Sequence, residues 1–191
     1  MKAGVWWYVG VTMAGKTTIA AHHLMKDVTQ NGRPALVIDS QGSSILEPLA
    51  PLVATVEEAV RRLWMLKRHV RFLPSSLSDV ERLFSAARAG GRINVLVDEA
   101  SYWMDSRSIT EPIARALRTH QHSELVIRLT TQHLADIARL AVQCSSGLYA
   151  FRCTSAGVLD RLRDEFGMDP AAVETLPQGS YLTWSGGFTK K

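Results

Sequence analysis

Short apolar runs alternate with amphipathic segments along most of this chain. The runs are rich in β-branched and aromatic residues, which predicts strands. These predicted strands cover residues 5–9, 35–38, 70–73, 93–99, 125–132, 148–152 and 181–184. Between them, apolar residues recur at helical spacing. This spacing predicts helices at residues 18–28, 55–68, 78–90, from 110 onward, 134–142 and 155–166. Such alternation predicts an α/β fold with a mostly parallel central sheet and helices on both faces.

Polar residues mark where several of these helices begin. Thr55-Val56-Glu57-Glu58 and Ser78-Asp79-Val80-Glu81 each place a hydroxyl three residues before an acid, the spacing of a capping box. Thr110-Glu111-Pro112 places proline in a first helical turn, and Gly167 stands where glycine commonly ends a helix. Because no repeat, low-complexity segment or linker interrupts the pattern, we expect a single domain over residues 1–191.

Amino-acid composition indicates a globular protein but does not identify its function. The 191 residues are 46% hydrophobic and 21% charged, as in an ordinary globular protein. The net charge of +4 permits a nucleic-acid partner without requiring one. Cys144 and Cys153 fit no metal-ligand spacing, which favours a reducing setting. The apolar start of the chain leads directly into a glycine loop, and no apolar run is long enough to span a bilayer. We therefore expect neither a signal peptide nor direct membrane insertion.

The loop after the first predicted strand carries the most specific motif in the chain. It reads G-x-x-x-x-G-K-T and stands between a predicted strand and a predicted helix, as a phosphate-binding P-loop does. Backbone N–H groups and a helix N-terminus converge on an anion in that arrangement. Lys16 would reach the β- and γ-phosphates, and the Thr17 hydroxyl would ligate Mg²⁺. The predicted ATP site comprises Gly10, Val11, Thr12, Met13, Ala14, Gly15, Lys16, Thr17 and Thr18.

The predicted strand at residues 93–99 ends in two acids, Asp98 and Glu99. A carboxylate delivered by an apolar strand to the edge of the sheet beside a P-loop holds Mg²⁺ in proteins of this kind (the Walker B motif). Glu99 would orient or deprotonate an attacking water. The alternative is a strand that simply ends in two solvated acids, which the P-loop upstream makes the weaker interpretation.

Gln132 ends the predicted strand that we expect beside the P-loop strand. An amide at that position can bond the γ-phosphate or the attacking water and so respond to hydrolysis. It can equally cap the helix predicted from Leu134. The residues alone leave both interpretations open.

Together these motifs resemble the FtsK–HerA superfamily of DNA-pumping ATPases. The resemblance extends from the P-loop and Asp39 to a strand ending in Arg152 and a Leu176-Pro177-Gln178-Gly179 turn. It implies a RecA-like P-loop NTPase fold of the ASCE type and Mg²⁺-dependent ATP hydrolysis that drives movement of double-stranded DNA. The short chain is most similar to genome-packaging ATPases of tailless, membrane-containing icosahedral viruses. Filamentous-phage assembly ATPases of the zonula-occludens-toxin type are a close alternative.

The resemblance also implies a homo-oligomeric ring, with six copies as the family expectation, in which a neighbour supplies an arginine to the γ-phosphate. Arg118 lies near the family's position for that residue, while Arg115 and Arg139 remain alternatives, and each can instead be a solvated surface residue. Expected partners are double-stranded DNA and possible capsid or membrane vertex proteins. The expected location is the host cytoplasm or the virion vertex.

A basic cluster accompanies the apolar face of the helix predicted at 55–68. In a ring, this face could turn toward a central channel and grip phosphates without reading sequence. A solvated helix face is the alternative. The cluster comprises Arg61, Arg62, Lys67, Arg68 and Arg71.

Two further classes of protein compete with a DNA motor. The P-loop and chain length resemble those of thymidine kinases, but those enzymes usually carry a four-cysteine zinc site and lack the Thr131-Gln132 pattern. The second competing class is a non-enzymatic interaction module that is switched by nucleotide binding. It is weaker because Glu99 supplies a catalytic carboxylate.

Overall fold

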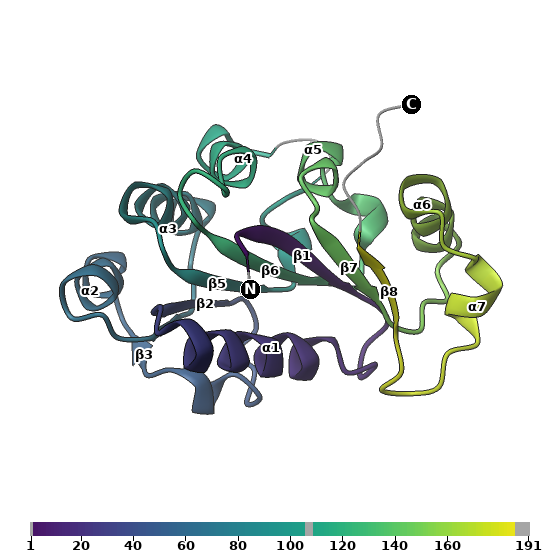
Figure 1. Cartoon of the computed structure of the whole chain (residues 1–191), viewed down its shortest axis with the longest axis horizontal. Coiled ribbons are helices and arrows are strands. Elements are labelled where there is room, and N and C mark those ends of the chain that lie inside the picture. The colour runs from purple at the N-terminus through teal and green to yellow at the C-terminus, as the bar shows by residue number, and fades with distance from the viewer. Residues whose placement is uncertain (1, 106–108, 186–191) are drawn as a thin grey trace.

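The structure, a computed structural model, describes residues 2–105 and 109–185. Within these residues, an 8-stranded sheet runs in the order β3-β4-β2-β5-β6-β1-β7-β8 (Figure 1). The strands are β1 Gly4–Val9, β2 Ala35–Asp39, β3 Leu52–Val53, β4 Val70–Phe72, β5 Asn94–Asp98, β6 Val126–Thr131, β7 Gly147–Ala150 and β8 Leu182–Ser185. All neighbouring pairs are parallel except β7 and β8. The predicted mostly parallel α/β sheet is confirmed.

The register of the sheet brings the predicted motifs to one edge. β6 lies between β1 and β5, so the strand that ends at Gln132 is the immediate neighbour of the P-loop strand, as expected. Val9 pairs with Thr131, and Asp39 pairs with Asp98 at the ends of β2 and β5. The carboxyl ends of parallel strands are where ligands bind in open α/β sheets.

Helices cover both faces of the sheet, as the sequence predicts. In Figure 1, α1 runs along one face, and α3, α4, α5 and α6 lie over the other. A smaller core packs Leu24 of α1 against Val37 and Leu96, while a larger core includes Phe84 of α3 and Leu117 of α4. The helices are α1 Lys16–Asn31, α2 Val56–Val60, α3 Leu77–Gly90, α4 Glu111–Arg118, α5 Arg139–Gln143, α6 Ala156–Phe166 and α7 Pro170–Glu174. None of those in the described residues is long and apolar enough to cross a membrane.

Two helix starts test the capping predictions. The Thr55 hydroxyl accepts a hydrogen bond from the Glu58 backbone N–H, so this half of the predicted box is confirmed. The Glu58 carboxylate accepts instead from the N–H of Ala54 (3.5 Å), one residue before Thr55. The predicted box at Ser78 is wrong, because the N-cap residue of α3 is Ser76, two residues earlier. There the Ser76 hydroxyl accepts from the Asp79 backbone N–H, and the Asp79 carboxylate accepts from that of Ser76. A hydroxyl three residues before an acid also occurs at this position, and it is the pair that the helix uses.

Two predicted helices are shorter than expected. The α-helix of residues 55–68 gives way after Val60 to a π-helical turn, Arg61–Met65, and the backbone of Lys67 is left-handed (φ 52°). The predicted helix 134–142 splits into a 3₁₀ turn, Leu134–Asp136, and α5. The split follows from a contact with a residue distant in sequence. The Ala138 N–H donates to the carbonyl of Met104 (2.9 Å), and this bond holds the backbone at Ile137, between the two short helices, in an extended conformation.

Candidate active site

The start of the P-loop, which follows β1, is bonded to the ends of both neighbouring strands, β6 and β7. The N–H of Gly10 donates to the carbonyl of Thr131 on β6 (3.2 Å), and the N–H of Val11 donates to that of Arg152 after β7 (2.9 Å). A Cβ at Gly10 would lie 2.7 Å from the Cβ of Phe151, closer than side chains approach. Glycine is therefore required at the first motif position by packing against Phe151, just after β7.

The turn of the loop uses left-handed backbone at two positions. Met13 has φ 60° and Gly15 has φ 100°, and a change between right- and left-handed backbone makes a concavity of N–H groups that suits an anion. The Met13 side chain stands at the apex and is 81% exposed. α1 then begins at Lys16, so its N-terminus also faces the space above the loop.

Lys16 is held inside the loop rather than extended into solvent. Only 6% of the residue is exposed, and its Nζ donates to the carbonyl of Val11 (2.9 Å). Burial lowers the pKa of this ammonium, while the nearby Glu99 and Asp98 carboxylates act in the opposite direction. The Lys16 ammonium therefore has one backbone carbonyl as its partner, that of Val11, and phosphate oxygens of a bound nucleotide would replace it.

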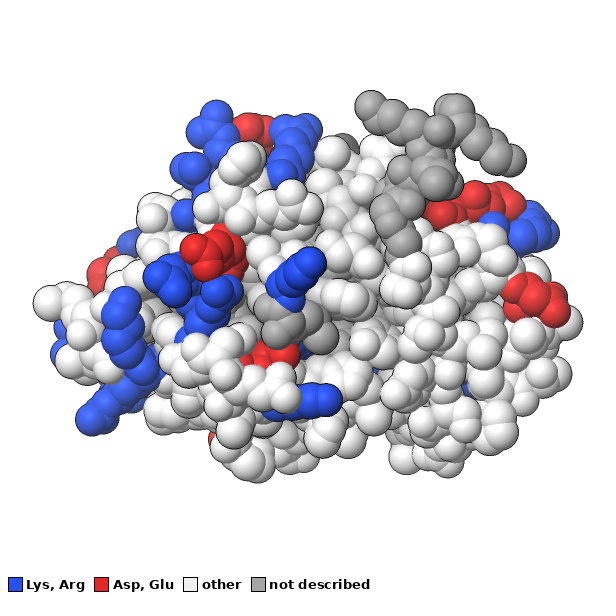
Figure 2. Space-filling view, viewed as in Figure 1, with Lys and Arg blue, Asp and Glu red and all other residues white. Residues whose placement is uncertain are grey.

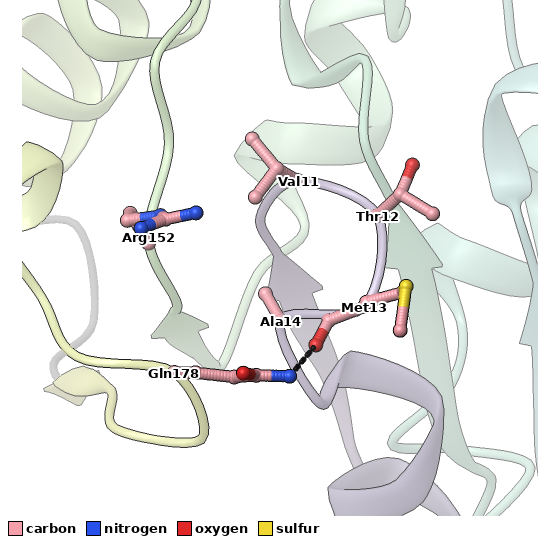
Figure 3. Close-up of a pocket in the computed structure, with 6 residues that line it drawn as sticks. All are labelled: Val11, Thr12, Met13, Ala14, Arg152 and Gln178. Atoms are coloured by element: carbon pink, nitrogen blue, oxygen red, sulfur yellow. Dashed lines mark hydrogen bonds between the residues drawn. The ribbon is translucent and has the colours of Figure 1, made fainter.

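Three of the hollows in the described structure border the loop. One of about 310 Å³ is lined by Met13, Gly15–Thr18 and Ile45, over the N-terminus of α1. Another, of about 350 Å³, extends from Gly10–Thr12 past Gln132 to the start of α6. The third, of about 280 Å³, lies between residues 11–14 and two side chains, Arg152 and Gln178. Figure 3 shows Arg152 extending toward the loop and the Gln178 amide donating to the carbonyl of Met13 (3.2 Å). The loop is thus accessible from several sides.

The Thr17 hydroxyl and the Asp98 carboxylate meet directly. Thr17 Oγ1 donates to Asp98 Oδ1 (2.8 Å), and Thr130 Oγ1 from the intervening strand donates to the same oxygen (2.8 Å). Burial raises the pKa of Asp98, the two hydroxyl bonds oppose this, and the Asp39 and Glu99 carboxylates raise it further. The two residues predicted to hold Mg²⁺ are therefore neighbours in space, 81 positions apart in sequence.

The oxygen atoms at this position suit Mg²⁺. The ion binds proteins through one or two carboxylates and keeps waters and phosphate oxygens as its other ligands. Thr17 and Asp98 supply one hydroxyl and one carboxylate, without a closed cage around them. Within the described residues, no group of three or more His, Cys, Asp or Glu side chains forms an alternative metal site.

Glu99 is held in place by burial and by hydrogen bonds to its carboxylate. It is 5% exposed, and its backbone is left-handed (φ 50°, ψ 69°), a conformation that costs a non-glycine residue on the order of 1 kcal/mol or more. Its Oε1 accepts from Thr131 Oγ1 (2.9 Å), the Gln132 N–H (3.0 Å) and Ser101 Oγ (2.7 Å). No bond within the described chain engages Oε2, so one carboxylate oxygen is held while the other stays available. The alternative of two solvated acids does not fit these buried side chains.

Gln132 contacts the P-loop and not the following helix. Its Oε1 accepts from Thr12 Oγ1 (2.6 Å), although the two residues are 120 positions apart. The 3₁₀ turn after it begins at Leu134, and its N-cap residue, His133, makes no side-chain capping bond. The geometry favours the interpretation of Gln132 as a residue that reports on the loop.

The three candidate arginines differ in their surroundings. Arg115 and Arg118 both lie on α4 and are exposed, and both approach the carboxylate of Glu111 (3.5 and 3.6 Å). Arg139 begins α5 just after the Gln132 segment, is exposed and makes no ion pair within the described residues. None of the three contacts the P-loop of its own chain in the described residues.

The predicted basic cluster divides into exposed and buried members. Arg61, Lys67 and Arg68 are exposed and make no ion pair within the described part of the chain, while Arg62 pairs with Glu58 (2.6 Å). Figure 2 shows basic side chains gathered over α2, α3 and α4. Arg71 is the exception to the prediction.

Arg71 is a structural residue of the sheet interior. It is only 8% exposed, and its guanidinium lies 3.3 Å from Asp39 Oδ2 and 3.4 Å from the Ser43 carbonyl. The prediction that it joins a DNA-binding surface is wrong, because β4 turns this side chain toward the end of β2. No sequence pattern predicts this pairing or the contacts of Ser40 with Asp98 and Trp103.

Cys153 borders the loop but is not a candidate nucleophile. Burial raises the pKa of its thiol to about 11, although Lys16 lies near enough to lower it slightly. A thiol with such a pKa is protonated and unreactive near neutral pH. Both Cys144 and Cys153 are free, as the sequence analysis expects.

Comparison with known proteins places this fold beside viral packaging NTPases. No family model and no curated protein matches the chain. The genome packaging NTPase B204 from Sulfolobus turreted icosahedral virus 2, in complex with ATP-gammaS, superposes with a TM-score of 0.83 at 18% identity. That match covers 96% of this chain and 92% of B204. VirB4 of Thermoanaerobacter pseudethanolicus matches with a TM-score of 0.66 at 8% identity, over 96% of this chain and 87% of VirB4. At these identities the likeness concerns the fold alone: it confirms the predicted P-loop NTPase fold, and in fold the chain resembles a viral packaging NTPase, as predicted.

Proposed function

We propose that this protein is a Mg²⁺-dependent ATPase that drives the movement of double-stranded DNA, as in the packaging of a viral genome into a preformed capsid. The single observation that carries the chemistry is the contact of Thr17 with Asp98, beside a Glu99 carboxylate fixed through one oxygen. The fold shared with the packaging NTPase B204 supports the biological setting.

The roles of the residues follow from their positions. Lys16 exchanges the Val11 carbonyl for phosphate oxygens, and the backbone of Gly10–Thr18 surrounds the triphosphate. Thr17 and Asp98 hold Mg²⁺, which when bound neutralises charge on the β- and γ-phosphates. Glu99 accepts the proton of the attacking water through its free oxygen. Gln132, in contact with Thr12, links the γ-phosphate position to the end of β6.

A ring of identical copies would complete the site. Arg152 lines the P-loop of its own chain, whereas Arg115, Arg118 and Arg139 make no contact with it in the described residues. Any of these three would therefore act on the P-loop of a neighbouring copy. Arg118 is our first candidate, and it must leave Glu111 to act. A head-to-tail ring repeats one interface, and six copies follow the family expectation. A capsid or membrane vertex protein is the expected recruiter, in the host cytoplasm or at the virion vertex.

The basic residues that follow α2 are the proposed DNA contact: three are exposed, and Arg62 is half-buried in its pair with Glu58. They would bind phosphates without reading sequence, which suits a motor that must move any genome. The proposed set is Arg61, Arg62, Lys67 and Arg68, without Arg71.

The test is ATP hydrolysis with and without double-stranded DNA, combined with molecular mass in solution. The wild-type chain should hydrolyse ATP only with Mg²⁺, and DNA should stimulate it. Lys16→Ala should remove turnover, and Glu99→Gln should retain bound ATP while hydrolysing it at least about 100-fold more slowly. A Glu99→Gln variant that turns over at the wild-type rate would show the base assignment to be wrong. Phosphorylation of thymidine without DNA stimulation would favour a nucleoside kinase, and nucleotide exchange without turnover would favour a switch.

A further inference from the structure

The peptide bond between Asp98 and Glu99 is held from both sides by hydroxyls of neighbouring strands. Its carbonyl accepts a hydrogen bond from Ser40 Oγ, just after β2 (2.6 Å). Its N–H, on Glu99, donates to Thr130 Oγ1 of β6 (2.9 Å). Both bonds lie at the point where the backbone turns into the left-handed conformation of Glu99. Rotation of this peptide would break both.

The Ser40 hydroxyl has a second partner, Trp103, in the segment that follows β5. The indole Nε1–H of Trp103 donates to Ser40 Oγ (2.7 Å) while Ser40 donates to the Asp98 carbonyl. A hydroxyl offers one donor and two acceptor positions, so both bonds can form together. Ser40 therefore joins the two ends of the 98–103 segment, between which Glu99 lies.

The position of Ser40 is itself well defined. The preceding Asp39 is fully buried, and its Oδ1 accepts backbone N–H bonds from Gln41 (3.2 Å), Gly42 (2.9 Å) and Ser43 (3.0 Å). Its other oxygen pairs with Arg71, which also donates to the Ser43 carbonyl. Residues 39–43 form a loop fixed by a buried ion pair, and we name it the β2 loop.

We propose that Ser40 is a positioning residue for hydrolysis, whose hydroxyl keeps the Asp98-Glu99 peptide in the orientation that aims the Glu99 carboxylate. A left-handed non-glycine residue persists only where its surroundings hold it. Without the Ser40 hydroxyl, the peptide can rotate and Glu99 can relax toward ordinary backbone angles. The base is then misplaced although the P-loop is intact. This inference rests on the proposed role of Glu99 in ATP hydrolysis.

The test compares Ser40→Ala with Ser44→Ala. Ser44 is exposed just beyond the β2 loop, and its hydroxyl makes no bond within the described residues. Ser40→Ala should lower kcat about tenfold with little change in KM for ATP, and Ser40→Thr should recover most of the rate. Equal kcat in Ser40→Ala and Ser44→Ala, or a raised KM with unchanged kcat, would overturn the inference. Should Ser40→Ala fail to fold, Ser40→Cys keeps the side-chain size with a much weaker donor and should show the same loss.

A readout without turnover separates this inference from the proposed function. Ser40→Ala frees the Trp103 indole, so the tryptophan emission spectrum should shift, and the shift should be absent in a Trp103→Phe background. Wild-type protein without ATPase activity would contradict the proposed function, and an emission shift specific to Ser40→Ala would still support the structural link. Unchanged emission in Ser40→Ala would contradict the link whatever the activity.

Discussion

The ends of β2 and β5 place two buried aspartates side by side, in the same register, with opposite surroundings. Asp39 accepts three backbone N–H bonds and pairs with the Arg71 guanidinium. Asp98, its partner in the ladder, accepts from the hydroxyls of Thr17 and Thr130 and, among the described residues, from no other side chain. Asp39 has a direct ion pair, whereas Asp98 makes none in the described residues, although the Lys16 ammonium lies near it.

This difference distinguishes a structural aspartate, Asp39, from a proposed metal-binding aspartate, Asp98, at the edge of the sheet. A buried carboxylate without a direct ion pair is costly, and burial accordingly raises the pKa of Asp98. An incoming Mg²⁺ would supply the missing charge. Asp39 needs no such partner, and its pair with Arg71 instead stabilises the loop that carries Ser40. Sequence places an acid at the end of both strands, and only their neighbours distinguish them.

Removing the charge of Asp39 should give the largest effect on stability. Asp39→Asn leaves the Arg71 guanidinium buried without its carboxylate, and breaking a buried pair in this way costs about 3 kcal/mol. Urea unfolding of metal-free protein should show the loss. Asp98→Asn is the matched variant one strand away and should not destabilise, since the amide oxygen can still accept from both hydroxyls. Equal destabilisation by the two substitutions would contradict the comparison.

A smaller effect concerns pH. The pKa of Asp98 is raised in the folded state, so the folded protein binds this proton more tightly than the unfolded chain. The free energy of unfolding should therefore fall, through this group, as pH rises from the ordinary carboxyl pKa of about 3.9 through the raised value.

The measurement is the difference in unfolding free energy between Asp98→Asn and wild type, in EDTA, from about pH 4 to about pH 7. The advantage of the variant should grow with pH. Mg²⁺ with a non-hydrolysable ATP analogue should then stabilise wild type and leave the variant nearly unchanged. A difference that is flat across this range would show that Asp98 ionises without cost.

Patterns that are continuous along the chain could be predicted from sequence. The P-loop, the Asp98-Glu99 strand end and the placement of Gln132 beside the loop all follow from strand order and local motifs. What could not be predicted depends on side chains that meet only after folding. Arg71 appears as one more basic residue near a helix until β4 places it against Asp39.

The same reasoning explains the errors in secondary structure. Residues 134–142 have a helical pattern, but the Ala138 bond to Met104 interrupts it, and no local signal announces a partner so distant in sequence. β3 and α7, which were not predicted, are only 2 and 5 residues long, too short for periodicity to appear. The Ser40 link is likewise invisible in sequence, where Ser40 is an ordinary residue of a turn.

The most direct test of the account is the affinity for Mn²⁺, used in place of Mg²⁺ and followed by electron paramagnetic resonance with a non-hydrolysable ATP analogue bound. Wild-type protein should hold the ion at Thr17 and Asp98. Asp98→Asn should weaken binding at least about tenfold, as loss of a metal-site residue does, while folded Asp39→Asn should remain within about threefold of wild type. Unchanged affinity in Asp98→Asn, or an equal loss in both variants, would contradict the assignment of the metal to the end of β5.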